Sequence, residues 1–125
     1  MIGIISKQSN HSVKESADRL ENLLTAKGIT VFARIDQQAE AWKAGLELSP
    51  IEFLLFGNPR AGTPIMSAVP LSALDLPLKA IAWQDKEGSV WLSYNEPGYL
   101  QQRYSLPEAL LKNIDIGPLI DQAAL

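Results

Sequence analysis

The chain has 125 residues, with 11 Lys and Arg against 14 Asp and Glu, and a formal net charge of −3 at pH 7. This acidic balance and the scatter of the basic residues argue against nucleic acid as a partner, because nucleic-acid binders usually carry a clustered basic surface. No cysteine is present, which excludes disulfides, thiolate nucleophiles and cysteine-ligated metal sites, and the length fits a single domain spanning residues 1–125.

The N-terminal part predicts a strand followed at once by a helix. Residues 2–8 are β-branched and short, which is typical of a strand. Ser12 and Glu15 then match a capping box, in which each side chain satisfies a backbone N–H at the start of a helix. An apolar stripe follows at helical spacing, and Gly28 supplies the C-terminal stop. His11, the single histidine, precedes this helix, and we expect it to be exposed.

Two further strands are expected in the middle of the chain. Residues 29–35 alternate apolar and polar side chains, as in a strand with one solvated face. Residues 51–56 are apolar on both faces apart from Glu52, so this strand is predicted to be central, with Glu52 exposed. Between the two, Asp36 can cap a short helix through Ala44.

That short helix is expected to direct Trp42 and Leu46 inward, since they recur at helical spacing. Further along, residues 78–85 and 89–95 flank a turn with Asp at its first position and Gly just after it, which predicts a hairpin.

The C-terminal part predicts short helical segments. Asn95 is expected to cap a turn, Pro107 to lie near the first position of another helix, and residues 118–125 to form a short helical end. The element order is therefore β-α-β-(α)-β-(α)-β-β-α. It predicts an α+β fold with a mainly antiparallel sheet of about five strands and helices packed on one face.

The stretch FGNPRAGTP, residues 56–64, follows a predicted strand and raises the question of a phosphate-binding loop. Gly57 and Gly62 have the spacing of a nucleotide P-loop, but Thr63 follows directly where that motif needs a lysine. Pro59 also removes one of the N–H donors on which such a loop depends. Nucleotide hydrolysis is therefore excluded.

Backbone geometry explains most of this stretch. Asn58 and Pro59 predict a turn, Gly62 is expected to allow a positive φ, and Thr63 to cap a helix that begins near Pro64. Arg60 has no such structural role. A helix N-terminus beside this arginine would also suit an anion, either a carboxylate or a phosphate.

Four stretches in the same order resemble the family catalogued as domain of unknown function 302: AGLEL, FGNPRAGTPIM, ALDLPLKAIAW and VWLSYNEPGYL. The resemblance covers roughly residues 30 to 106. It implies a small α+β domain of the TATA-binding-protein-like class, with a curved antiparallel sheet and helices packed on one side, often found as a homodimer. It implies no particular activity.

Two positions depart from the family pattern. Many members carry histidine where this chain has Gln37 and Tyr104. Any role of those imidazoles as metal ligands or proton shuttles is therefore not carried over, and we predict neither a metal nor a cofactor.

We favour a non-enzymatic, homodimeric domain that binds a small ligand, with an anion as one option, between the Gly57–Thr63 loop and the Tyr94–Tyr99 turn, since binding residues concentrate on loops over a rigid sheet. Trp83 and Trp91 on the hairpin are expected to pack against each other, with a stacking surface for a planar ligand as the alternative. The predicted ligand-binding residues are Gly57, Asn58, Arg60, Gly62, Thr63, Tyr94 and Asn95.

Two other functions fit the sequence. One is a structural or protein-interaction module that acts as a homodimer without a ligand. The other is a small enzyme that uses a carboxylate at Asp36 or Glu96. No segment approaches the roughly 18 apolar residues of a membrane span, and the N-terminus lacks the apolar run of a signal peptide, so we predict a cytoplasmic protein without a membrane partner.

Overall fold

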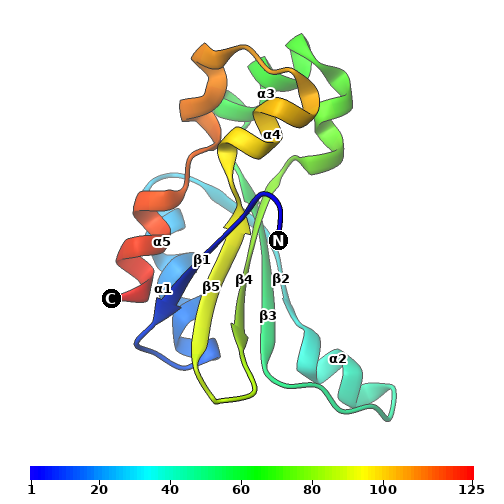
Figure 1. Ribbon diagram of the computed structural model, residues 1–125, viewed down its shortest axis with the longest axis vertical. Helices are drawn as coiled ribbons and strands as arrows, with labels where there is room; N and C mark the ends of the chain where they lie inside the picture. The colour runs from blue at the N-terminus through cyan, green and yellow to red at the C-terminus, as the bar shows by residue number, and fades with distance from the viewer.

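Five antiparallel strands form one sheet in the order β1-β5-β4-β3-β2 (Figure 1). The computed structural model describes all 125 residues. The strands are β1 (Ile4–Ser9), β2 (Thr30–Asp36), β3 (Ile51–Gly57), β4 (Leu78–Gln84) and β5 (Val90–Asn95). All five lie close to their predicted ranges. The predicted α+β class, with an antiparallel sheet, is therefore confirmed.

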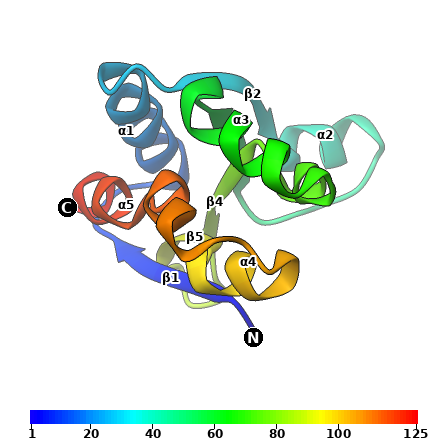
Figure 2. The same ribbon diagram turned by 90° about the horizontal axis from the view of Figure 1, so that it is seen from above.

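The helices form three groups. Their bounds are α1 (Val13–Ala26), α2 (Gln37–Lys43), α3 (Pro59–Ala68), α4 (Pro97–Tyr104) and α5 (Gly117–Ala124), with 3-10 helices η1 (Pro70–Asp75) and η2 (Glu108–Ile114). Helices α1 and α5 lie together on one side of the sheet (Figure 2). An upper lobe of α3, η1, α4 and η2 lies at one end of the strands, and α2 projects at the opposite end (Figure 1).

Helix α1 forms where the sequence predicts it. The Ser12 hydroxyl accepts a hydrogen bond from the Glu15 N–H at 3.1 Å, and the chain leaves the helix through Gly28 at φ +75°. Its apolar stripe is buried against the sheet, with Ala17, Leu20 and Leu24 fully buried. The cap and the stripe thus fix both the start of the helix and the face that it presents.

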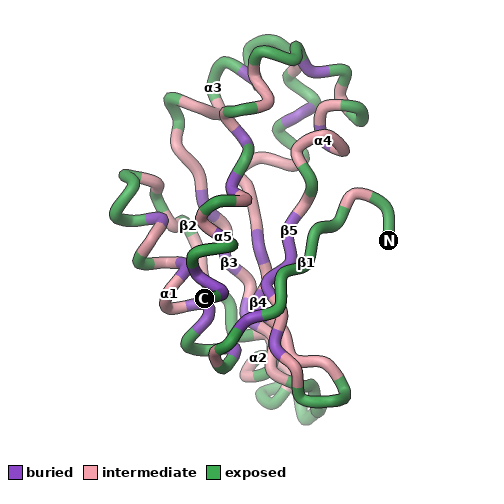
Figure 3. Tube along the Cα trace, turned by 60° about the vertical axis from the view of Figure 1, so that its left-hand side comes forward, coloured by how far each residue is buried: buried purple, intermediate pink, exposed green.

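The covered face of the sheet holds most of the core. Leu54 and Phe56 of β3 and Leu92 of β5 are fully buried beneath α1 and α5. Burying each such side chain stabilises the fold by about 1.5–3 kcal/mol. Figure 3 shows buried residues along α1, α5 and the central strands, while α2 contains none.

The opposite face of the sheet, which we call the open face, has no such layer. Because side chains alternate along a strand, the residues between the core positions point to this side. Cross-strand pairing places Trp83 opposite both Trp91 and Ile51, and Ile81 opposite both Phe53 and Ser93. All of these are partly exposed except Ser93. Ser93 is 6% exposed, and its hydroxyl hydrogen-bonds the Ser6 hydroxyl and accepts from the Trp83 indole N–H at 2.8 Å. The predicted packing of the two tryptophans across the hairpin agrees with this register.

Several predictions within the helices are wrong. Trp42 and Leu46 do not face inward but are 76% and 63% exposed, since nothing packs on α2. Asn95, which is expected to cap a turn at Pro97, is instead the last residue of β5. Pro97 begins α4, and the residue in the capping position is Glu96, whose side chain makes no capping bond. The helix expected near Pro107 is present, since Pro107 precedes η2, and it differs from an α-helix in being a 3-10 helix.

Two polar side chains expected to be exposed are largely buried. Glu52 is 8% exposed and pairs with Arg34. The His11 side chain is 24% exposed, and its Nε2 is buried without a hydrogen-bond partner. In both cases the polar character of the residue misled the prediction.

Candidate functional site

The Gly57–Thr63 segment is not a loop: Gly57 ends β3, Asn58 is the cap of α3, and the helix begins at Pro59. The Asn58 Oδ1 caps α3 by accepting from the Arg60 N–H at 3.0 Å, and the Asn58 carbonyl accepts from the N–H groups of Ala61 and Gly62 at 2.9 Å each. Gly62 has no positive φ, and Thr63 and Pro64 lie inside the helix. The expected cap at Thr63 is therefore wrong, and the Gly62 N–H is already used within the chain.

Four of the predicted ligand-binding residues line one cavity. Gly57, Asn58, Gly62 and Thr63 surround a space of about 170 Å³ at the upper end of the sheet. The other lining residues come from β2, from α3, from β4 and the two residues before it, and from η2: Phe32, Pro59, Met66, Leu76, Pro77, Leu78, Asn113 and Ile114. The structure thus brings this part of the predicted site together.

The other three predicted residues lie elsewhere. Arg60 is exposed on α3 and does not line the cavity. Tyr94 points to the covered face, where it belongs to the core beside Gly117. Burial, together with the charge of Asp115, raises the pKa of Tyr94. Asn95 alternates to the open face, so these three side chains do not converge on one ligand.

An ionic cluster in the upper lobe centres on Asp75. Its carboxylate accepts from the Tyr104 hydroxyl and from Arg103 Nη1 at 2.7 Å, and Lys79 Nζ lies 3.6 Å away. Burial and the hydrogen bond to Asp75 raise the pKa of Tyr104. Gln37 begins α2 at the opposite end of the sheet, so the two positions where the family often has histidine lie far apart within one chain (Figure 1).

A second network binds β2 and β3 to α1. Arg34 donates to Glu52 at 2.7 Å, to Asp18 at 2.6 Å and to Glu21 at 3.1 Å. The hydrogen bond from Arg34 holds the pKa of Asp18 below its usual range. Sequence reasoning missed this network because its partners are 13 to 18 residues from Arg34. Alternation in the sequence gave the opposite signal, because it predicted a solvated face for the polar residues of β2. The register shift between Val31 and Ala33 instead turns Arg34 to the covered side of the sheet.

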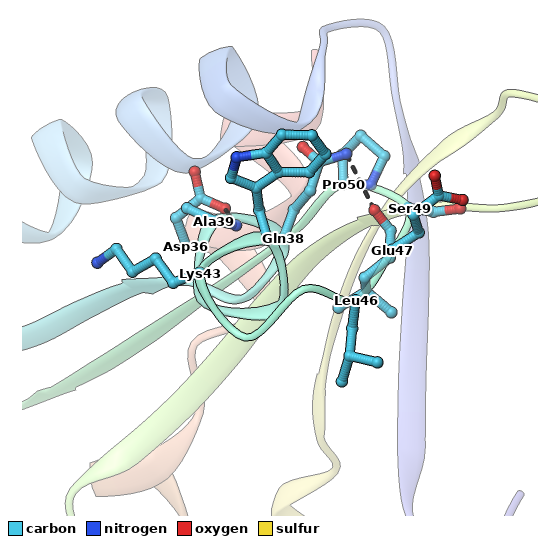
Figure 4. Close-up of a pocket in the computed structure, with 10 residues that line it drawn as sticks. Asp36, Gln38, Ala39, Lys43, Leu46, Glu47, Ser49 and Pro50 are labelled. Atoms are coloured by element: carbon cyan, nitrogen blue, oxygen red, sulfur yellow. Dashed lines mark hydrogen bonds between the residues drawn. The ribbon is translucent and has the colours of Figure 1, made fainter.

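An open groove of about 870 Å³ runs along α2 and the segment that follows it (Figure 4). Gln38 Nε2 donates to the Leu48 carbonyl at 3.0 Å and holds this segment against the helix. Asp36 caps α2 by accepting from the Ala39 N–H at 2.9 Å. Glu96 lies at the other end of the sheet, so these two carboxylates do not form a pair. No group of three or more His, Cys, Asp or Glu side chains could hold a metal ion.

Together these features define a small α+β domain whose antiparallel sheet is covered by helices on one face and uncovered on the other. The chain belongs to the family described as "Domain of unknown function DUF302", whose model matches residues 5–117. A similar fold is found in the crystal structure of an uncharacterized conserved DUF302 protein from Bacillus stearothermophilus. It has a TM-score of 0.81 and 20% identity, and the match covers 99% of this chain and 97% of that one.

Curated relatives are longer proteins. Fluoride-specific ion channel FluC 1 of Brucella suis is 44% identical over 104 residues, which are 83% of this chain and 41% of that protein. Fluoride-specific ion channel FluC 2 of Brucella melitensis matches equally well over 38% of its length. This chain therefore spans about two fifths of these relatives. None of its own helices has both the length and the apolar character that a membrane crossing requires.

Proposed function

We propose that this domain is a self-association module, in which two copies pack their open faces together as a homodimer. The observation that carries the proposal is the apolar composition of that face. Trp83, Trp91, Phe53, Ile51 and Ile81 lie next to one another in the register of three adjacent strands and are partly exposed to water. Contiguous apolar surface of this kind marks interaction sites on globular domains.

The size of the open face suits a second copy of the chain. Five strands about 4.8 Å apart, each about six residues long, present roughly 500 Å². Each partner in a standard interface buries about 800 Å². Trp42, Leu46 and Leu48, which are 76%, 63% and 42% exposed, are further exposed apolar side chains on α2 and the segment after it. Two sheets can pack face to face at a spacing of about 10 Å, which needs no change in either fold.

In the longer relatives, a domain similar to this chain is joined to further sequence, which self-association would bring together. They are named as fluoride-specific ion channels, and the region similar to this chain is about two fifths of each. Pairing of this domain would hold two copies of the attached sequence close together and raise their effective concentration. The domain would thereby favour the association of two copies of the longer protein.

The test introduces a charge at the centre of the open face. We expect Ile81→Asp to weaken dimerisation by about a hundredfold or more, because a carboxylate would be buried without a partner. Leu74→Asp is the matched control, since Leu74 is 70% exposed on η1, away from the sheet. Sedimentation should give a dimer for the wild type and Leu74→Asp and a folded monomer for Ile81→Asp. A monomeric wild type at high concentration, or a dimeric Ile81→Asp, would contradict the proposal.

The other two functions predicted from the sequence stay predictions. An anionic ligand at Arg60 gains no support from backbone donors, because the nearby N–H groups of Ala61 and Gly62 are bonded within the helix. An enzyme that uses one of these carboxylates would depend on Asp36 or Glu96 alone, because the two lie at opposite ends of the sheet. Titration with charged probes and the Arg60→Ala variant, described for the cavity beside Gly57, also tests binding at Arg60.

A further inference from the structure

The cavity beside Gly57 lies away from the open face and has the features of a binding site. Its walls are mainly apolar and come from four separate parts of the chain, including Phe32, Met66, Pro77 and Ile114. The volume of about 170 Å³ is close to the roughly 150 Å³ of a protein cavity that binds benzene. A single six-membered ring with one substituent therefore matches this volume.

No charged side chain lines this cavity. A charged ligand would lose its hydration there without gaining a counter-charge, which is costly in an apolar site. The uncharged, mainly apolar lining of the cavity therefore favours a neutral ligand over a charged one. This conclusion differs from the anionic option that the sequence left open, because Arg60 lies outside the cavity.

Two amides at the cavity are held in fixed orientations. The Asn58 Oδ1 accepts from the Arg60 N–H, which leaves its Nδ2 to donate. Asn113 Nδ2 donates to the Ala61 carbonyl at 3.1 Å, which leaves its Oδ1 to accept. A neutral ligand with one hydroxyl or one ring N–H could bond to one of these groups while its ring contacts the apolar walls.

Phe32 forms part of the opening. It lies where the register of β2 against β3 shifts between Val31 and Ala33, so this bulge redirects its side chain out of the regular alternation. The residue is 53% exposed and also lines the cavity. Gly57 permits this arrangement, because a Cβ there would lie 3.4 Å from the Phe32 ring and 3.3 Å from Pro77 Cβ.

We propose that this cavity binds a small, neutral, single-ring molecule carrying one polar group, with Phe32 at its entrance. Phenol is the probe, with benzene as the apolar analogue and benzoate, inorganic phosphate and fluoride as charged probes. Binding is measured by NMR titration of the Met66 methyl group and by thermal shift. We expect phenol to shift the Met66 signal saturably, benzene to do so more weakly, and the charged probes to leave it unchanged.

Substitutions at Gly62 test whether phenol binds in this cavity. A Cβ there would lie 3.7 Å from Met66 Cε, an ordinary contact, so Gly62→Ala should fold and narrow the cavity. We expect at least about tenfold weaker phenol binding, since one methylene in an apolar pocket is worth roughly that much. Gly62→Leu should abolish binding. Arg60→Ala, on the same helix but outside the cavity, should bind phenol like the wild type.

Other outcomes overturn the proposal. They are the absence of saturable binding by either neutral probe, unchanged phenol binding in Gly62→Leu with its fold intact, and equal or tighter binding of a charged probe. A charged probe whose binding is lost in Arg60→Ala would instead support the anion site. All measurements can be repeated with Ile81→Asp, so failure of self-association and failure of this site are distinguished.

Discussion

The two faces of the sheet are built from the same strands, yet they differ in what they contact. Leu54 and Leu55 are neighbours on β3, but Leu54 is fully buried under α1 while Leu55 is partly exposed on the open face. The covered face contains the packing that stabilises a single chain. The open face contributes less to that stability, so its apolar residues are available for another molecule. Because successive side chains of one strand point to opposite faces, one set can stabilise the fold while the other set remains free to contact another molecule.

The largest expected effect comes from truncating these two leucines in turn. Leu54→Ala should lower the free energy of unfolding by about 3 kcal/mol, because it leaves a cavity in the core. Leu55→Ala should cost about 1 kcal/mol, since water already reaches its side chain. Both are measured by urea unfolding in the Ile81→Asp background, where the open face is not covered. If both variants lost the same free energy of unfolding, the two faces would contribute equally to stability, contrary to this comparison.

The covered face also contains a largely buried ion pair, and breaking it should have an effect of similar size. The Glu52 side chain is 11% exposed, and Arg34→Met would leave it without its closest cationic partner. We expect a loss of about 3 kcal/mol, whereas Arg34→Met with Glu52→Met should recover most of it. Lys14→Ala, which removes an exposed ion pair with Asp18, should cost less than about 0.5 kcal/mol. Denaturant unfolding of all three variants checks the order.

A smaller effect should appear at alkaline pH. Burial beneath α5 raises the pKa of Tyr94, so the folded chain holds this proton more tightly than the unfolded chain. The resulting stabilisation is present below pH about 10, where an unfolded tyrosine titrates, and is lost as pH rises through the higher folded value. Tyr94→Phe should therefore make stability decline less steeply above pH 10. An unchanged slope in thermal unfolding would argue against burial as the cause.

The smallest expected effect concerns the two capped helices. Ser12→Ala should lower global stability by about 1 kcal/mol, because α1 packs on the covered face. Asp36→Ala removes an equivalent cap from α2, which contains no buried residue, so global stability should change by less than about 0.5 kcal/mol. Hydrogen exchange at the Ala39 amide should nevertheless become faster. A large global loss in Asp36→Ala would mean that α2 belongs to the cooperative core.

Local patterns in the sequence predict the sheet well. Alternation identifies β2, and the turn at Asp85 identifies the hairpin, where the Asp85 side chain accepts from the N–H groups of Glu87 and Ser89. The cap at Ser12 is local for the same reason. Such features depend on residues that are close in the sequence, so they can be inferred before any tertiary contact is known.

Features that depend on distant partners could not be inferred. The burial of Glu52 requires Arg34, 18 residues away, and the exposure of Trp42 follows from the absence of a surface opposite α2. At the candidate site, Pro64 suggested a helix start, whereas α3 begins at Pro59 and includes Pro64 as an interior residue. The cavity itself needs Phe32 and Asn113, which no local motif links to Gly57.

The bulge at Phe32 also affects the outer edge of β2. Unpaired N–H and C=O groups along an edge strand are a template for adding strands from other molecules without limit. The register shift between Val31 and Ala33 interrupts that template, and Arg34 follows it directly. At the other edge, α5 lies against β1, where the Ala124 carbonyl accepts from the Asn10 N–H at 3.0 Å. Strand addition is therefore disfavoured at the β2 edge, and at the β1 edge the bonded Asn10 N–H removes one donor just beyond the strand.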